Sequence, residues 1–163
     1  MQSSEQNQLS NETGGSVVCF GVLSYLQLMV VGKVPVHNGG TPIQQLTDSY
    51  GDDAAIVAGM LHQMGQKTTL VASALGDDEL GRKVAATINQ RGVPVDVRIN
   101  PTVSTVAELS IADPSGARTY FYQRTSELLN TLDTADLTPL ENATSLYVDW
   151  YDGDHILRPM QAA

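Results

Sequence analysis

The chain has 163 residues, a formal net charge of −9 and 42% hydrophobic residues. This length suits one domain, and the apolar fraction is enough for a sizeable core. The nine lysines and arginines are scattered along the chain, so we expect no cationic surface for nucleic acid or anionic membranes. Cys19 is the only cysteine, which excludes an internal disulfide and a thiolate zinc site and favours a cytoplasmic location.

The first 16 residues are polar and rich in Gln, Asn and Ser. Such a segment cannot offset the entropy of its own ordering, so we predict a disordered tail over residues 1–16 and a folded domain over 17–163. No apolar run approaches the ~20 residues that a membrane span needs. We therefore expect neither a membrane nor a nucleic-acid partner.

Val17–Leu23 (VVCFGVL) predicts the first buried strand, in which Gly21 allows a close backbone approach. Residues 30–50 contain glycines and prolines that interrupt the pattern. We expect only short β-like pieces there, such as Val34–His37.

Two helix starts then lie on either side of a strand. Apolar side chains recur at helical spacing after Asp53, and Gly65 stands where a C-terminal cap is expected, so we predict a helix over residues 53–64. Thr68–Ala74 (TTLVASA) lacks charge and predicts a buried parallel strand. A second helix follows the acidic run Asp77–Glu79, whose charges suit a helix N-terminus. The expected inward positions of the two helices are Ala54, Val57, Ala58, Leu61 and Met64, then Leu80, Val84 and Ile88.

In residues 95–123 the apolar side chains no longer recur at helical spacing but alternate with polar ones. Apolar and polar side chains alternate from Val103 to Ile111, Asp113–Gly116 has the composition of a tight turn, and Arg118–Tyr122 supplies a return strand. The pattern predicts a hairpin with one polar face. A sheet this small needs something to cover its apolar face, and its own domain is about as good a candidate as a substrate or a partner.

Beyond Thr125, leucines indicate a short helix, and Ser145–Trp150 (SLYVDW) predicts another buried strand. An acidic loop follows, but it lacks the regular ligand spacing of a calcium site, so we predict no metal. We interpret its carboxylates as caps of a helix that begins near His155. Because ligands of open α/β sheets bind at the carboxyl ends of the strands, Asp149 or Asp152 could also point at a ligand.

The run Gly51–Gly81 resembles the first signature of the ribokinase-like (PfkB) carbohydrate kinases. The second half of that signature is kept in Gly76-Asp77-Asp78 and Gly81. In the first half, Gly51 matches the first of two glycines, while Asp52 stands at the second and Ile56 at a sugar-binding Asn. Leu26 likewise stands where the family has a sugar-binding Asp at the end of its first strand.

The resemblance implies a ribokinase-like, doubly wound and mainly parallel α/β sheet, incomplete here, with a small β-sheet lid from about residues 30–50 and 95–123. It also implies that this chain corresponds to the N-terminal half of a kinase. In complete members a Gly-Ala-Gly-Asp turn holds the phosphates and supplies the base, and that turn does not occur in these 163 residues. We therefore expect no catalytic residue in this chain. ATP and Mg²⁺ are implied for a complete member, with neither expected to bind this chain alone.

The implied activity is phosphoryl transfer from ATP to a hydroxyl of a sugar or nucleoside, with this chain supplying the sugar-side wall and the lid. Helix capping is the alternative role for Asp52 and Asp53. The alternative function is that of a degenerate family member, which binds sugar or dimerises through the lid without catalysis. The candidate substrate-binding residues are Gly51, Asp52, Asp53, Ile56, Leu26 and Asp149.

Overall fold

The structure is a computed structural model that describes residues 15–163. The predicted tail therefore lies outside the described residues except for Gly15 and Ser16. Ser16 is held against the domain, because its hydroxyl donates to Asn142 O at 2.7 Å and its carbonyl accepts from Thr144 N at 2.9 Å. Within the described residues, no helix is long and apolar enough to cross a bilayer.

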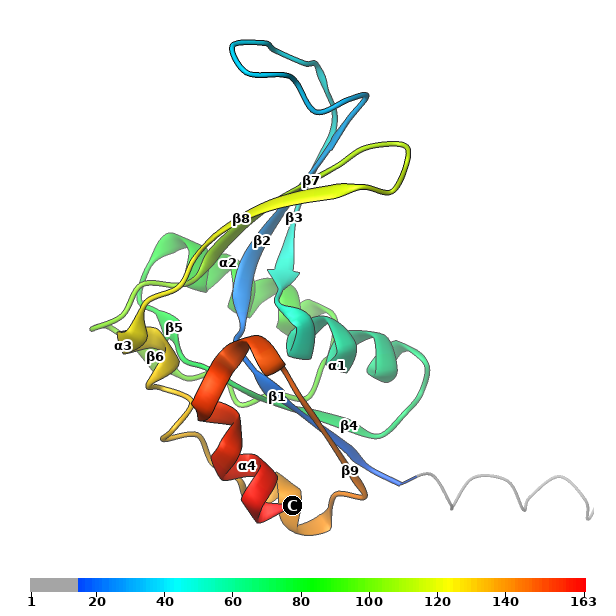
Figure 1. Cartoon of the computed structure of the whole chain (residues 1–163). Coiled ribbons are helices and arrows are strands. Elements are labelled where there is room, and N and C mark those ends of the chain that lie inside the picture. The colour runs from blue at the N-terminus through cyan, green and yellow to red at the C-terminus, as the bar shows by residue number, and fades with distance from the viewer. Residues whose placement is uncertain (1–14) are drawn as a thin grey trace, which may run out of the picture.

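A parallel sheet lies at the centre of the domain (Figure 1). Its strands are β1 (Val17–Gly21), β4 (Thr68–Ala72) and β9 (Ser145–Val148), in the order β4-β1-β9. Both neighbours run parallel to β1. The three strands expected from the sequence thus lie in one sheet, which we call the first sheet, although each ends before its predicted last residue.

Helical segments cover both faces of the first sheet, as in a doubly wound fold. The alternation along β1 separates two cores: Cys19 packs in one with α1 (Asp53–Gln63) and α2 (Glu79–Gln90). Val18 and Phe20 pack in the other with apolar residues of α3 (Ser126–Leu129) and η1 (Thr138–Asn142). The chain ends in η2 (Trp150–Ile156) and α4 (Leu157–Ala162).

A four-stranded second sheet rises away from this body (Figure 1). Its strands are β2 (Ser24–Val31), β3 (Ile43–Gly51), β7 (Ala107–Ala112) and β8 (Arg118–Gln123), in the order β3-β2-β7-β8. Two more short strands, β5 (Leu75–Gly76) and β6 (Ile99–Asn100), pair with each other in parallel.

Three local predictions were wrong. Val34–His37 is not a strand but part of the connection between β2 and β3, because the chain passes almost directly from β1 into the long strand β2. The strand expected to alternate from Val103 begins at Ala107. Met64, expected to face inward, caps the C-terminus of α1 and is 79% exposed.

The register of the second sheet defines the side chains on each of its faces. Leu26 pairs with both Ser49 and Glu108, and Glu108 pairs with Tyr122. Residues paired across strands project from the same face, and so do residues two apart along a strand. Leu26, Glu108, Tyr122 and Tyr120 therefore share one face of the second sheet.

Candidate functional site

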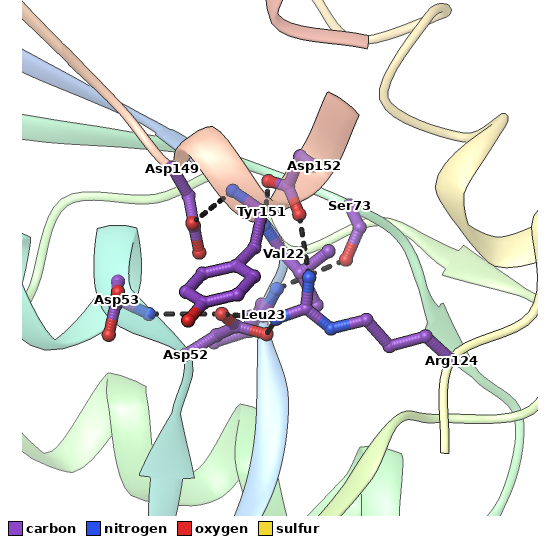
Figure 2. A network of polar contacts seen from close by, with 9 residues as sticks. All are labelled: Val22, Leu23, Asp52, Asp53, Ser73, Arg124, Asp149, Tyr151 and Asp152. Atoms are coloured by element: carbon purple, nitrogen blue, oxygen red, sulfur yellow. Dashed lines mark hydrogen bonds and ion pairs between the residues drawn. The ribbon is translucent and has the colours of Figure 1, made fainter. Parts of the chain in front are cut away.

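Polar side chains from distant parts of the chain meet where β1 passes into β2 (Figure 2). Arg124, directly after β8, contacts two carboxylates there. Its Nη2 donates to both oxygens of Asp52 at 2.7 Å, and its Nη1 donates to Asp152 Oδ1 at 3.0 Å. Asp52 lies between β3 and α1, and Asp152 lies in η2, so this arginine joins the base of the second sheet to the first.

A third carboxylate, Asp149, lies at the end of β9 in the same cluster. Its Oδ1 accepts from Tyr151 N at 2.9 Å, whereas its Oδ2 is buried and accepts from no N–H group. The remaining donors are backbone groups, Asp53 N to Asp52 Oδ1 at 3.0 Å and Val22 N to Asp152 Oδ2 at 3.2 Å. We call Asp52, Asp149, Asp152 and Arg124 the carboxylate cluster.

Burial dominates the electrostatics of the carboxylate cluster. It raises the pKa of Asp52 to about 8, with the contact to Asp149 adding to the rise and Arg124 opposing it. Burial likewise raises the pKa of Asp152 to about 6, and the charge of Asp149 adds to that rise. Near neutral pH, Asp52 therefore retains a proton, which it can donate to Asp149 Oδ2.

The backbone of Asp52 has φ 78° and ψ 152°. This conformation is almost confined to glycine and costs other residues on the order of 1–3 kcal/mol. The position at which the family resemblance expects a second glycine thus has the backbone of a glycine. Here the strained aspartate is held by its bonds to Arg124 and Asp53 N.

Aromatic side chains from β8 and η2 border the cluster. The rings of Tyr120 and Tyr122 stack with centroids 6.3 Å apart, and those of Trp150 and Tyr151 lie 4.0 Å apart. The Tyr151 hydroxyl hydrogen-bonds to Tyr120, which raises the pKa of Tyr151. This contact connects the two pairs of rings. We call these four residues the aromatic strip. It meets the cluster where the Arg124 guanidinium lies 5.6 Å from the Tyr122 ring centroid.

The structure brings most of the candidate residues from the sequence together. Gly51 is buried at the end of β3, where an added Cβ would lie 2.7 Å from Leu26 Cβ. Asp52 caps α1 and joins Asp149 in the cluster, and Asp53 is exposed in the first turn of α1. Ile56 lies further along α1, is 38% exposed and is not part of the cluster.

Arg124 and Tyr151 are the site residues that sequence reasoning missed. Arg124 stands directly after the alternating strand, but its partners lie 72 and 28 residues away, so no local spacing connects them. The interpretation of the acidic loop also needs correction. Asp149 caps the 3-10 turn at Trp150 rather than a helix near His155, and His155 itself contacts Asp133 at 2.9 Å.

The chemistry of the cluster suits hydroxyl or cationic groups rather than phosphate. In residues 15–163, no group of three or more His, Cys, Asp or Glu side chains is placed to hold a metal ion. Three buried carboxylates with one arginine would repel the phosphates of ATP, so the cluster does not fit a nucleotide. A separate polar cavity of about 220 Å³ adjoins Gln123 and Thr125, the neighbours of Arg124, and no residue of the cluster lines it.

Several solved structures share this fold. A protein from Agrobacterium tumefaciens described as a ribokinase aligns with a TM-score of 0.72 at 22% identity, over 83% of this chain and 44% of its own. The ribokinase of Giardia lamblia aligns with a TM-score of 0.69 at 15% identity, over 91% and 47%. The fructokinase of Xylella fastidiosa with bound ATP aligns with a TM-score of 0.64 at 20% identity, over 92% and 49%.

The chain thus spans about half the length of these structures. No curated protein matches its sequence. The family model for pfkB family carbohydrate kinases, however, matches residues 15–157, far more than half of the chain. The protein therefore belongs to the pfkB family of carbohydrate kinases.

Proposed function

We propose that this chain forms the sugar-binding wall and the lid of a phosphotransferase that moves a phosphate from ATP to a hydroxyl of a sugar or nucleoside. The contact of Arg124 with Asp52 and Asp152 is the observation that carries the proposal. It fixes the base of the second sheet, which acts as the lid, beside the carboxyl ends of the first-sheet strands. Ligands of open α/β sheets bind at those ends.

The wall binds hydroxyl groups. A carboxylate has two oxygens that accept hydroxyl protons, and Asp53 presents an exposed carboxylate in the first turn of α1 beside the cluster. Leu26 and the Tyr122 ring, on the same face of the second sheet, offer apolar surface to the ring of the substrate. The chain's own contribution is therefore binding, orientation and exclusion of water.

We assign no catalytic base and no phosphate-binding turn to this chain. Its sequence contains no Gly-Ala-Gly-Asp, and its carboxylate cluster would repel phosphate. ATP would supply the transferred phosphate, and Mg²⁺ would neutralise its charge. The residues that bind them would lie outside the cluster.

Calorimetric titration of the full chain with D-ribose, D-fructose and adenosine tests the proposal. At least one of them should bind, and Asp53→Asn should weaken that binding about tenfold, because a hydrogen bond to a charged acceptor is lost. Asp77→Asn is the matched control, because Asp77 is also exposed and lies next to Asp78, the N-cap aspartate of α2. Equal losses in the two variants would contradict the proposed site.

The apolar residues at two sugar-contact positions of the family favour a second candidate function. Leu26 packs against Gly51, and Ile56 is a partly exposed apolar side chain. A non-catalytic module that dimerises through the lid would need neither polar contact. If none of the three ligands binds while the chain is dimeric, this alternative replaces the first proposal.

A further inference from the structure

A polar cavity lies where the hairpin of β7 and β8 joins the body of the domain, apart from the carboxylate cluster. The hairpin is attached by two connections, residues 101–106 before β7 and residues 124–125 before α3 (Figure 1). The cavity of about 220 Å³ is lined by residues 102–105 of the first connection and by Gln123, Thr125 and Glu127 around the second. We call it the connection pocket. A molecule in it would contact both connections at once.

The protein itself holds both connections in place. On the first, Thr105 N donates to Asp78 Oδ2 at 2.8 Å, and Thr105 Oγ1 accepts from Gly76 N at 2.9 Å. On the second, Thr125 Oγ1 accepts from Leu128 N at 3.3 Å and caps α3. The connection pocket is therefore formed before any ligand arrives, which lowers the cost of binding.

Neutral hydroxyl groups suit this pocket best. Six of the seven residues that line it are polar, and Ser104, Gln123 and Glu127 are exposed, so their polar atoms are available to a ligand. Hydroxyl and amide groups both donate and accept hydrogen bonds, as the groups of a polyol do. Glu127 is the one charged residue among those that line the pocket, so it would repel a phosphate, while an exposed carboxylate adds little affinity for a cation. The volume is smaller than the roughly 300–1,000 Å³ of most ligand sites, which favours a molecule of a few carbons.

The connection pocket and the carboxylate cluster lie on opposite sides of one chain segment. Thr125 has an extended backbone, with φ −115° and ψ 153°, and successive side chains of an extended chain point to opposite sides. Gln123 and Thr125 accordingly line the pocket, while Arg124 between them contacts Asp52 and Asp152. An occupant of the pocket would thus restrict the segment that Arg124 fixes from the other side.

We propose that the connection pocket is a second binding site, for a small neutral polyol, whose occupant holds the hairpin of β7 and β8 against the body. The site is separate from the sugar-binding wall, so the inference goes beyond the proposed function. The hairpin carries Glu108 and Tyr122 on the face that it shares with Leu26. A ligand that orders the hairpin lowers the cost of ordering it again when the wall binds its own ligand.

Nuclear magnetic resonance of the full 17.5 kDa chain, labelled with nitrogen-15, tests the inference with glycerol, erythritol and xylitol. At least one polyol should cause saturable shifts of the amide signals of residues 102–105 and 123–127. With that polyol at about ten times its Kd, the amides of β7 and β8 should exchange with water about tenfold more slowly, because the hairpin opens only after the ligand leaves. Inorganic phosphate should cause no saturable shift at these residues.

Two variants locate the site. Ser104→Trp fills the pocket from an exposed position and should weaken polyol binding at least about tenfold. Thr119→Trp adds the same side chain at an exposed position of β8 that does not line the pocket, so it should bind as the wild type does. Circular dichroism verifies that both variants fold. If Ser104→Trp is unfolded, Gln123→Ala replaces it, because it removes one polar contact of the pocket.

Several results would overturn the inference. They are the absence of saturable shifts at the two connections, polyol binding without slower exchange in the hairpin, and saturable binding of phosphate in the pocket. Slower exchange that is equal in the wild type and Ser104→Trp would also overturn it, because polyols excluded from protein surfaces stabilise any fold. Shifts that centre on Asp53 and survive Ser104→Trp would place the polyol at the sugar-binding wall, which would support the proposed function and reject the second site.

Discussion

Arg124 is the residue that compensates the buried charge where the two sheets meet. Its side chain is 17% exposed, and those of Asp52 and Asp152 are 4% and 0% exposed. Removal of one partner from such a buried network leaves uncompensated charge. We therefore expect Arg124→Gln to lower the free energy of unfolding by about 3 kcal/mol or more, as measured by urea denaturation.

The matched control is Arg82→Gln, because Arg82 pairs with Asp77 at 3.4 Å while both side chains are about two-thirds exposed. Such a surface pair contributes roughly 0–1 kcal/mol. Similar losses in the two variants would show that the Arg124 contact is no stronger than a surface pair.

Asp52 should make the protein less stable as pH rises. The folded-state pKa of its carboxyl is about 8, against an ordinary value of 3.8. The folded chain therefore holds a proton that the unfolded chain has released, and this stabilising contribution is lost as the pH rises toward and through about 8. The free energy of unfolding should fall from about pH 5 to pH 9 more steeply in the wild type than in Asp52→Asn.

Urea denaturation at intervals across this range measures the difference in slope. Asp152, whose pKa is raised to about 6, makes the free energy of unfolding fall over a lower part of the pH range in both proteins. It is therefore not the source of the difference in slope. Parallel pH profiles for the wild type and Asp52→Asn would contradict the raised pKa of Asp52.

At the scale of elements, the Gly76–Gly81 motif has a structural role. Asp78 accepts from Gly81 N at 2.7 Å and from Thr105 N at 2.8 Å, so it joins the start of α2 to the segment that leads into β7. A Cβ on Gly81 would lie 2.3 Å from Gly76 O and 2.8 Å from Thr105 Oγ1. We expect Gly81→Ala to cost about 1–3 kcal/mol of stability through overpacking, as measured by thermal unfolding.

Gly40→Ala is the control for this element, because nothing lies within 4 Å of a Cβ added there. Both substitutions change the entropy of the unfolded chain alike, so their difference reports the packing at the start of α2. A Gly81→Ala variant as stable as Gly40→Ala would exclude this tight junction.

At the scale of the whole molecule, the second sheet offers an unpaired edge. All six residues of β8 are exposed, and Phe121 is 59% exposed on the face opposite Tyr120 and Tyr122. Exposed edges with large apolar side chains tend to pair with another chain. We expect sedimentation velocity to show a dimer of the 17.5 kDa chain, and Phe121→Lys to convert it to a monomer.

Met160→Lys is the control for dimerisation. Met160 is 54% exposed but lies on α4, away from the second sheet. It should leave the dimer intact. A monomeric wild type, or a Phe121→Lys variant that stays dimeric, would reject the second sheet as the dimer interface.

Local sequence patterns determined much of the fold. The uncharged segments at Val17 and Thr68, rich in β-branched residues, became β1 and β4 of the first sheet, because a strand buried on both faces must be apolar throughout. The segment at Ser145 became β9 of the same sheet, but it is only half-buried. Gly65 has positive φ at the helix end where the spacing placed it, and Gly92 has positive φ just after α2. The turn at Asp113–Gly116 also joins two paired strands as predicted.

Only the tertiary structure decided the site. The sequence supplied Asp52 and Asp149 as candidates, but the cluster depends on Arg124, whose bonds span 72 and 28 residues. Periodicity reports which face of an element is buried and says nothing about which distant charge will meet it. The burial of Asp149 Oδ2 beside Asp52 likewise exists only because the strand ends converge, since an isolated carboxylate would be satisfied by water.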